Sequence, residues 1–533
     1  MLTGVSIIGS TSAAPSGAAF SGVNPATGEK LSPEYFSSNT DDLNRAASLA
    51  TEAFATYGKL SGRKKAEFLR HIADGLDSRA TELVERAHQE TALPKPRLQG
   101  EVLRTSNQLR LFAGVVEEGS WLMARIDLAD AERKPLPKPD IRSMLRPLGP
   151  VAVFGASNFP LAFSVAGGDT ASALAAGNPV IVKAHPAHPG TSELAGQVIR
   201  ESVRACGLPE GVFSLLFDAG VAIGSALVQH PQVKAVGFTG SLAAGRALMD
   251  LAAARPEPIP CFTEMSSTNP VFILPGALEE RSGAIAEGLF GSFTLGAGQF
   301  CTKPGMVFLP ELAKTDAFLA DLRRRAAESP SFTMLTAGIA KHYKHALGAR
   351  EDDKGVEVTS KPAEGAASTF STSAAVLETD VATLLADPAL AEEIFGPTTL
   401  IVRHQKREEI LKAAESLSGH LTATIIGTAA DIESYRDLIA ILERKVGRLL
   451  FNGYPTGVEV CHAMIHGGPY PATSDGRSTS VGSQAIFRFA RPVCYQNFPE
   501  AALPEELKSG NPLGILRMVN GAMTRDAAIS SAG

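Results

Sequence analysis

Short apolar runs alternate with helical segments between residues 151 and 238, and this pattern constrains the fold more than any other feature of the chain. The apolar runs are VAVF (151–154), PVIVK (179–183), VFSLL (212–216) and VKAVGF (233–238). The segments between them predict helices at 161–176, 191–205 and 221–229. This alternation is typical of a parallel sheet with crossover helices, in which ligands bind beyond the carboxyl ends of the strands. The sequence therefore predicts an α/β domain of the nucleotide-binding type, with its ligand near the loops after Phe154, Lys183 and Phe238.

Other regions complete the expected organisation. Apolar residues three and four apart predict helices from about 41 to 125, and residues 1–35 are expected to be irregular or to form an edge segment. The charged, Pro-rich stretch 130–142 is expected to be a linker or a protruding segment. A second alternation includes VFIL (271–274), MVFL (306–309), TATII (422–426) and RLLFN (448–452), and it predicts a second α/β domain. The tail from Arg491 is expected to be loop-like.

Length and composition exclude several classes of protein. A chain of 533 residues is expected to form two or more domains. Its net charge of −6, with no basic cluster larger than residues 323–325, argues against nucleic-acid binding. No apolar run reaches the roughly 18 residues of a membrane span, and the N-terminus lacks the pattern of a signal peptide. Five scattered cysteines without a CxxC pair predict no metal site and fit a reducing compartment. We expect a cytoplasmic protein.

Three side chains are candidates for chemistry. Cys301, in GAGQFCTKPG, is a lone thiol among glycines and suits a nucleophile, although a buried structural thiol is the favoured interpretation when this residue is taken alone. Glu264, in TEMSSTNP, suits a general base, or else a solvated carboxylate. Asn158 follows the first strand of the alternation, where a carboxamide can stabilise an oxyanion or simply form a turn.

The stretch GSLAAG (240–245) follows the strand that ends at Phe238 and opens a helix. Its glycines, Gly240 and Gly245, allow the backbone to approach a ligand, and a helix N-terminus presents free N–H groups to phosphate. The stretch is not GxGxxG, so an ordinary strand-to-helix turn is the alternative.

Taken in order, GASNFP, VGFTGS, TEMSSTNP, GQFCTKPG and EEIFGP (392–397) resemble the motif set of the aldehyde dehydrogenase superfamily, and NPATGE (24–29) extends the resemblance over most of the chain. The resemblance implies a Rossmann-type cofactor domain, a second α/β catalytic domain and a small oligomerisation arm. The expected boundaries are 1–129 with 148–266 for the NAD(P)-binding domain, 267–488 for the catalytic domain, and 130–147 with 489–533 for the arm and tail. A homodimer or homotetramer is expected.

The resemblance also implies a catalytic role for each candidate. Cys301 attacks the aldehyde carbon to give a thiohemiacetal and later carries a thioester. Asn158, with the backbone N–H of Cys301, holds the oxyanion, and Glu264 activates the water that hydrolyses the thioester. The Leu-Gly-Gly that usually follows the family's base is Met265-Ser266-Ser267 here, so the local backbone is expected to differ. Phe163 is a candidate tunnel wall, with ordinary core packing as the alternative.

Cofactor contacts follow from the same resemblance. Lys183 matches a ribose contact, Gly240 and Ser241 match pyrophosphate contacts, and Glu393 and Phe395 match contacts to the nicotinamide ribose and ring. Position 186, where NAD-using members often carry an acid, is a proline. Lys183 and His185 lie near it, so NADP is favoured and NAD is the alternative.

Within the superfamily, EMSSTNP, GQFCTKPG and HGGPYPAT (466–473) are most similar to the α-ketoglutaric semialdehyde (2,5-dioxovalerate) dehydrogenase branch. The expected reaction is NAD(P)-dependent oxidation of this semialdehyde to 2-oxoglutarate. Long-chain fatty aldehydes and succinic semialdehyde are alternative substrates. A coenzyme A-acylating enzyme, which typically lacks the base, and a catalytically silent member of the fold are further alternatives.

Overall fold

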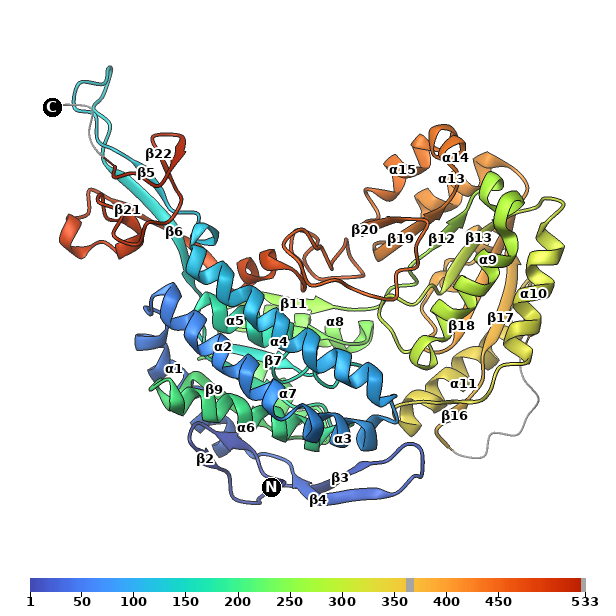
Figure 1. Ribbon diagram of the computed structural model, residues 1–533, viewed down its shortest axis with the longest axis horizontal. Coiled ribbons are helices and arrows are strands. Elements are labelled where there is room, and N and C mark those ends of the chain that lie inside the picture. Colours follow the sequence, from blue (N-terminus) through green and yellow to red (C-terminus); the bar gives the residue numbers. More distant parts are fainter. Residues whose placement is uncertain (361–368, 529–533) are drawn as a thin grey trace.

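A computed structural model describes residues 1–360 and 369–528, and its elements form two α/β lobes and a projecting arm (Figure 1). The first lobe contains the N-terminal half of the chain, and the second contains most of the residues from about 270 to 451. A long segment after residue 451 returns from the second lobe to the first. Residues 361–368 of the predicted catalytic domain and 529–533 of the predicted tail lie outside the described residues.

The first lobe is built on a seven-stranded sheet in the order β11-β10-β7-β8-β9-β1-β2. Its strands are β1 (Ile7–Ile8), β2 (Thr11–Ser12), β7 (Val151–Phe154), β8 (Val180–Lys183), β9 (Phe213–Leu216), β10 (Ala235–Thr239) and β11 (Cys261–Glu264). The five strands from β7 to β11 are parallel, as predicted, and β1 adds to β9 in the antiparallel sense. Chain order reverses between β7 and β10, so a switch point with a ligand crevice lies beyond their carboxyl ends.

Helices cover both faces of this sheet (Figure 1). They are α1 (Thr40–Tyr57), α2 (Gly62–Ser78), α3 (Ala80–Thr91), α4 (Lys95–Glu118), α5 (Gly168–Ala176), α6 (Pro189–Ala205), α7 (Ala222–Gln229) and α8 (Leu242–Ala253). The predicted helix at 161–176 is too long at its N-terminus, because α5 begins at Gly168. The N–H groups of Leu161 and Ala162 donate instead to Oε1 of buried Glu101 on α4, at 2.9 and 3.0 Å. This carboxylate satisfies the backbone without a helix.

The second lobe has a seven-stranded sheet in the order β15-β17-β18-β13-β12-β19-β20. Its strands are β12 (Val271–Ile273), β13 (Met306–Pro310), β15 (Glu357–Ser360), β17 (Ala375–Asp380), β18 (Thr398–His404), β19 (His420–Ile426) and β20 (Val446–Phe451). All neighbours are parallel except β15 and β17. Phe272 and Phe308 stack in its core with ring centroids 4.7 Å apart. The predicted second α/β unit is therefore present, and the fold class is confirmed.

The helices of the second lobe are α9 (Pro275–Thr294), α10 (Thr315–Ala327), α11 (Ala337–Glu351), α12 (Val381–Ala386), α13 (Arg407–Ser416), α14 (Ala429–Ser434) and α15 (Arg436–Leu442). Within the described ranges, no helix of either lobe is both long and apolar enough to cross a membrane. Two small antiparallel pairs complete the body of the molecule: β3 (Ala19–Val23) with β4 (Lys30–Phe36), and β14 (Phe332–Thr333) with β16 (Ser371–Thr372).

The arm is a five-stranded sheet that projects from the first lobe (Figure 1). It contains β5 (Arg125–Asp127), β6 (Ile141–Pro147), β21 (Ala490–Gln496), β22 (Arg517–Val519) and β23 (Ala522–Thr524). The tail was expected to be loop-like, and this expectation is wrong: β21 pairs with β6 over seven residues. Pairing with a strand more than 340 residues earlier gives no local signal, because it satisfies the backbone through tertiary contact. The arm sheet includes β5, which precedes residue 130, and the domain boundaries stay predictions.

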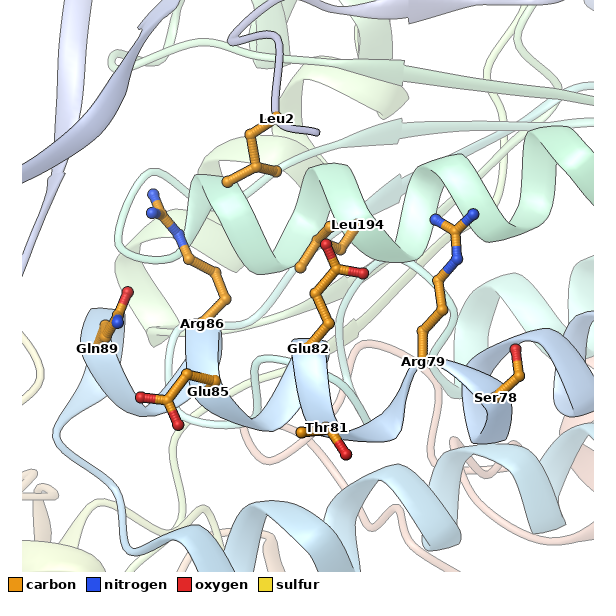
Figure 2. A pocket seen from close by; sticks show the side chains of 9 residues that line it. All are labelled: Leu2, Ser78, Arg79, Thr81, Glu82, Glu85, Arg86, Gln89 and Leu194. Carbon is orange, nitrogen blue, oxygen red and sulfur yellow. The ribbon is translucent and has the colours of Figure 1, made fainter.

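A surface hollow lies between α3 and α6, close to the N-terminus (Figure 2). None of the predicted site residues lines it. Its charged side chains are engaged in ion pairs of opposite sign: Arg79 with Glu201, Arg86 with Glu90, and Glu85 with Lys95. The hollow therefore presents no uniform charge to a ligand, and the candidate chemistry lies between the lobes instead.

Candidate active site

Cys301 lies in the loop between η3 (Leu295–Gly298) and β13, where the second lobe meets the first. Three consecutive residues of this loop, Gly296, Ala297 and Gly298, have positive φ. A Cβ at Gly298 would lie 2.2 Å from the backbone of Gly396, so glycine is required for the loop to pack against the EEIFGP segment. Sγ of Cys301 lies 3.7 Å from Nε2 of His466.

Asn269 holds the Cys301 loop in place through hydrogen bonds to the backbone of that loop. This fully buried carboxamide donates from Nδ2 to the carbonyls of Cys301 and Lys303, at 2.8 and 2.9 Å. Its Oδ1 accepts from the hydroxyls of Ser267 and Thr422. Asn269 has φ of 48°, a left-handed conformation that asparagine tolerates better than most residues. The nucleophile candidate is thereby bound to the segment that follows Glu264.

Glu264 ends β11 and is buried, with both carboxylate oxygens bound. Oε1 lies 2.9 Å from Nε2 of His466, and Oε2 accepts a hydrogen bond of 2.7 Å from the hydroxyl of Ser480. Burial raises the pKa of Glu264, but His466 and the hydrogen bonds to the carboxylate outweigh burial and lower the pKa below its ordinary value. The carboxylate is therefore ionised at neutral pH and can accept a proton.

The Cys301 thiol has the opposite shift. Burial and the neighbouring negative charge of Glu264 raise its pKa well above the ordinary value. The resting pair is thus a protonated thiol beside an ionised carboxylate, which suits transfer of the thiol proton as the sulfur attacks. Donor atoms of Glu264, Cys301 and His466 lie within 4.8 Å of one another, as cation ligands do. The 2.9 Å contact between Glu264 and His466 is that of a hydrogen bond.

Asn158 lies in the loop after β7 and points toward the Cys301 loop. Its Nδ2 donates to the backbone carbonyl of Gln299 at 3.0 Å. The backbone carbonyl of Asn158 accepts a hydrogen bond from Nη2 of Arg97 at 2.9 Å. Among residues 1–360 and 369–528, the second N–H of the carboxamide has no partner, so it can donate to a ligand beside Cys301. Phe163, the candidate tunnel wall, has its ring centroid 6.1 Å from that of His466, so it borders the same site.

Lys183 and His185 lie at the carboxyl end of β8, beside the switch point. Nζ of Lys183 donates to the carbonyl of Asp218 at 2.9 Å, and burial lowers its pKa. His185 stacks on His188 and accepts at Nδ1 from the N–H of Ala187. Burial lowers the pKa of both histidines, so at neutral pH neither adds positive charge.

The stretch 240–245 begins α8 directly beyond β10. The hydroxyl of Ser241 caps the helix by accepting from the N–H of Ala244, and the first turn is solvent-exposed. An exposed helix N-terminus at the switch point fits the phosphates of a dinucleotide. A Cβ at Gly245 would lie 2.6 Å from Cγ of Met265, so packing against Met265 explains this glycine.

Glu393 and Phe395 lie in the segment that packs on the Cys301 loop. Glu393 accepts a 2.6 Å hydrogen bond from the hydroxyl of Ser266, and its burial raises the pKa of its carboxyl group. Nζ of buried Lys303 donates to the carbonyls of Ile394 and Thr398, at 2.8 and 3.0 Å. Ser266, which departs from the family pattern, thus ties the Glu264 segment to Glu393.

Comparison with known proteins identifies the family. The profile of the Aldehyde dehydrogenase family matches residues 12–478. The chain belongs to the aldehyde dehydrogenase family. It is 51% identical to alpha-ketoglutaric semialdehyde dehydrogenase 2 of Azospirillum brasilense, over 98% of this chain and 99% of that protein. It is 46% identical to alpha-ketoglutaric semialdehyde dehydrogenase of Acinetobacter baylyi, over 91% and 92%.

Solved structures are similar in fold. A 1-pyrroline-5-carboxylate dehydrogenase from Thermus with bound NAD aligns with a TM-score of 0.76, at 20% identity, over 92% of each chain. The predicted family and fold are therefore confirmed, and this aldehyde dehydrogenase oxidises an aldehyde with NAD or NADP as cofactor.

The structure brings Cys301, Glu264 and Asn158 to one place from three separate elements of this dehydrogenase. Sequence analysis did not single out His466, Ser480, Asn269 or Lys303, which hold these residues. His466 and Asn269 stand inside stretches that carried the family resemblance, HGGPYPAT and TEMSSTNP. Their roles depend on partners 30 to 200 residues away, so the motifs alone did not indicate them.

Proposed function

We propose that the enzyme oxidises α-ketoglutaric semialdehyde (2,5-dioxovalerate) to 2-oxoglutarate, and that it accepts NADP in preference to NAD. One observation carries the choice of substrate: 51% identity over almost the whole chain to a relative named for that activity. The grouping of Cys301 with Glu264 and Asn158 supports the same reaction chemistry.

In the first step, the thiol of Cys301 loses its proton to the Glu264 carboxylate as its sulfur attacks the aldehyde carbon. A C–S bond forms, and the carbonyl π electrons move onto oxygen. Nδ2 of Asn158 and the backbone N–H of Cys301 stabilise that oxyanion, an interaction that is strong in a buried site. A nicotinamide cofactor, when bound, would accept the hydride from the carbon that is bonded to the sulfur of Cys301. Cys301 then carries the acyl group as a thioester.

Before the second step, Glu264 releases the thiol proton to solvent and is ionised again. It then accepts a proton from water as the water oxygen attacks the thioester carbon, and it passes this proton to the departing sulfur of Cys301. The C–S bond breaks, the carboxylic acid leaves and Cys301 regains its proton. Because His466 and Ser480 bind the two oxygens of Glu264, the base is held in one orientation. A positioned base contributes about 100- to 10,000-fold to such a step.

For the cofactor, we propose that Lys183 and His185 border the adenosine ribose. The turn next to the pyrophosphate is formed by Gly240, Ser241 and Gly245. The nicotinamide end is held by Glu393 and Phe395. The preference for NADP rests on the missing acid at Pro186 and on the charge of Lys183. The neutral histidines add no charge, which leaves Lys183 as the main positive group at this edge.

A substrate panel tests the proposal. Purified enzyme is assayed at 340 nm with 2,5-dioxovalerate, succinic semialdehyde and decanal, each with NAD and with NADP. We expect the highest kcat/KM for 2,5-dioxovalerate with NADP, without coenzyme A. A higher value for decanal or succinic semialdehyde would assign one of the alternative substrates.

A Cys301→Ala variant tests the nucleophile. It is expected to lose turnover but still bind NADPH in a fluorescence titration, and retained turnover would refute the assignment of Cys301.

We also propose that the arm joins subunits of a homodimer or homotetramer, with the domain boundaries 1–129 and 148–266, 267–488, and 130–147 with 489–533. The projection of the arm sheet from the first lobe supports this (Figure 1). Light scattering coupled to size-exclusion chromatography gives the test, and a monomer at micromolar concentration contradicts it.

A further inference from the structure

One face of α4 is directed at the active site. Arg97, Glu101, Arg104 and Gln108 are spaced by four, three and four residues, so they share one side of the helix. Arg97 binds the carbonyl of Asn158, and Glu101 binds the backbone of the loop that carries Phe163. These contacts hold the loop after β7. Arg104 makes no hydrogen bond to that loop within the described ranges.

The guanidinium of Arg104 is buried and largely unpaired. Neither Nη1 nor Nη2 has a hydrogen-bond partner among residues 1–360 and 369–528. The carboxylates of Glu101, Glu264 and Glu459 act on the Arg104 charge without bonding to either nitrogen. Within the described ranges, the guanidinium makes one hydrogen bond, from Nε to the carbonyl of Val458 at 3.4 Å. Guanidinium stays charged even when buried, and a buried charged group whose N–H donors lack hydrogen-bond partners is costly. The two free nitrogens suit a bidentate carboxylate.

Arg104 lies a short distance from the nucleophile. Its Cζ is 5.0 Å from the ring centroid of Phe163, and that ring is 6.1 Å from the ring of His466. Nε2 of His466 is in turn 3.7 Å from Sγ of Cys301. Arg104 and Cys301 are near enough for the charge of each to shift the pKa of the other. In 2,5-dioxovalerate, a three-carbon chain separates the carboxylate from the aldehyde carbon.

A second arginine, Arg448, also faces Cys301 but is already engaged. Its Nη1 and Nη2 donate to the carbonyls of Gly457 and Pro455, both at 2.8 Å. Those bonds fix the segment that leads to His466 and engage both terminal nitrogens, so that only Nε of Arg448 lacks a partner among residues 1–360 and 369–528. Of the two arginines, Arg104 alone has both terminal nitrogens free within the described part of the chain.

We infer that Arg104 binds the carboxylate of the semialdehyde substrate and selects it against uncharged aldehydes. This inference rests on the proposed function. The carboxylate pairs with both Nη atoms while Cys301 reaches the aldehyde carbon. An alkyl aldehyde would leave the guanidinium buried and unpaired, so the site discriminates by the missing partner as well as by the bond it forms.

The test compares Arg104→Met and Arg104→Lys with wild-type enzyme on 2,5-dioxovalerate and on pentanal, which has five carbons but neither the carboxylate nor the 2-oxo group. For Arg104→Met, we expect kcat/KM to fall about 100-fold on 2,5-dioxovalerate but by less than about threefold on pentanal. Arg104→Lys keeps the charge without the planar fork and is expected to lose about tenfold in kcat/KM on the semialdehyde only.

The matched control is Arg110→Met on the outer side of α4, where Arg110 pairs with Asp74 and Asp77. The substrate preference of this variant is expected to stay unchanged.

The outcomes separate the two proposals. If wild-type enzyme does not prefer 2,5-dioxovalerate to pentanal, the proposed substrate is wrong and the role of Arg104 falls with it. If wild-type enzyme shows the preference and Arg104→Met retains it, only the assignment of Arg104 is wrong. Equal losses on both substrates in Arg104→Lys, a variant with the charge intact, would also overturn the assignment, because they indicate a structural role. Turnover of pentanal reports that each variant is folded.

Discussion

Nε2 of His466 lies 2.9 Å from Oε1 of Glu264, and both side chains are almost completely buried. Nδ1 of His466 has no hydrogen-bond partner within the described ranges, so the tautomer with its proton on Nε2 leaves only a lone pair unpaired. In that tautomer His466 donates to the carboxylate. The histidine thus stabilises the ionised form of the proposed base and fixes its direction toward Cys301.

Replacement of Glu264 by glutamine is expected to separate the two chemical steps. Glutamine fills the same volume but cannot accept a proton, so hydrolysis of the thioester is expected to slow about 100- to 1,000-fold. The variant also removes the negative charge that raises the pKa of the Cys301 thiol, so the thiol can lose its proton to solvent and the first step is expected to slow less than the hydrolysis. Rapid mixing at 340 nm is then expected to show a burst of reduced cofactor near one equivalent per site, followed by a slow steady state. The double variant Cys301→Ala, Glu264→Gln is the control and is expected to show no burst. A Glu264→Gln enzyme with wild-type steady-state turnover would contradict the assignment.

The contact between His466 and Glu264 predicts a pH effect. In the folded enzyme the pKa of Glu264 is below its ordinary value, so this carboxylate stabilises the fold above its unfolded pKa, and that stability is lost as pH falls through the folded pKa. In His466→Phe, burial acts without the compensating histidine, and the pKa of Glu264 is expected to rise. The acidic limb of the profile of kcat against pH therefore moves to higher pH.

His466→Gln supplies the matched comparison, because glutamine can place an N–H donor near the position of Nε2. We expect this variant to return the acidic limb toward the wild-type profile. Should His466→Phe leave the limb where it is in the wild-type enzyme, Glu264 would not be the group that titrates, or His466 would not control it.

Asn269 is expected to support both stability and catalysis. Asn269→Ala removes donors from the carbonyls of Cys301 and Lys303 and strains a left-handed residue, for a loss of about 3 kcal/mol in the free energy of unfolding. Because the Cys301 loop loosens, kcat is expected to fall as well. Urea denaturation and steady-state kinetics measure the two effects.

Asn178 offers the control for Asn269. It is equally buried and also donates to two backbone carbonyls, those of Ala173 and Phe489, far in sequence from Cys301. Asn178→Ala is expected to lose comparable stability but to keep kcat per folded molecule. Equal kcat losses in the two variants would mean that destabilisation alone, rather than the position of the Cys301 loop, accounts for the effect at Asn269.

The alternation of apolar runs with helical segments was sufficient to predict the parallel strands around β7. The ordered family motifs were sufficient to propose the three candidate catalytic residues. Both signals are local: an apolar run such as VAVF needs no distant partner to indicate a buried strand. The start of α5 and the pairing of β21 with β6 were not predicted, because each depends on a contact from far along the chain. Glu101 replaces helical acceptors in the first case, and Ile141–Pro147 supplies a strand partner in the second.

The same distinction applies to the site. Cys301 and Glu264 were recognisable because their own stretches carry the family pattern. Arg104 and Lys303 were not, since a charged residue on an amphipathic helix or after a cysteine has many ordinary explanations. Only burial without an ion pair, which is a tertiary property, distinguishes them from surface charges.

Lys303 predicts that the stability of the enzyme depends on pH. This lysine is almost completely buried, and burial lowers its pKa to about 8. Its folded pKa lies below the unfolded value, so its contribution to stability is largest above pH 10.5 and is lost as pH falls through about 8. Relative to Lys303→Met, wild-type enzyme is expected to gain roughly 3 kcal/mol of unfolding free energy across that window. Urea denaturation at several pH values measures the difference, and a pH-independent difference contradicts the assignment.

The bonds from Nζ of Lys303 to the carbonyls of Ile394 and Thr398 also hold the segment that carries Glu393 and Phe395. In Lys303→Met this segment loses both bonds, and the KM for NADP is expected to rise about tenfold, the effect of one to two lost charge-assisted hydrogen bonds. The KM for the aldehyde is expected to change less, because Arg104 and Phe163 lie on the other lobe. Lys445 is the matched control, since its Nζ also donates to two carbonyls, those of Glu415 and Leu417. If Lys445→Met raised the KM for NADP equally, the effect would be general loosening rather than loss of the cofactor segment.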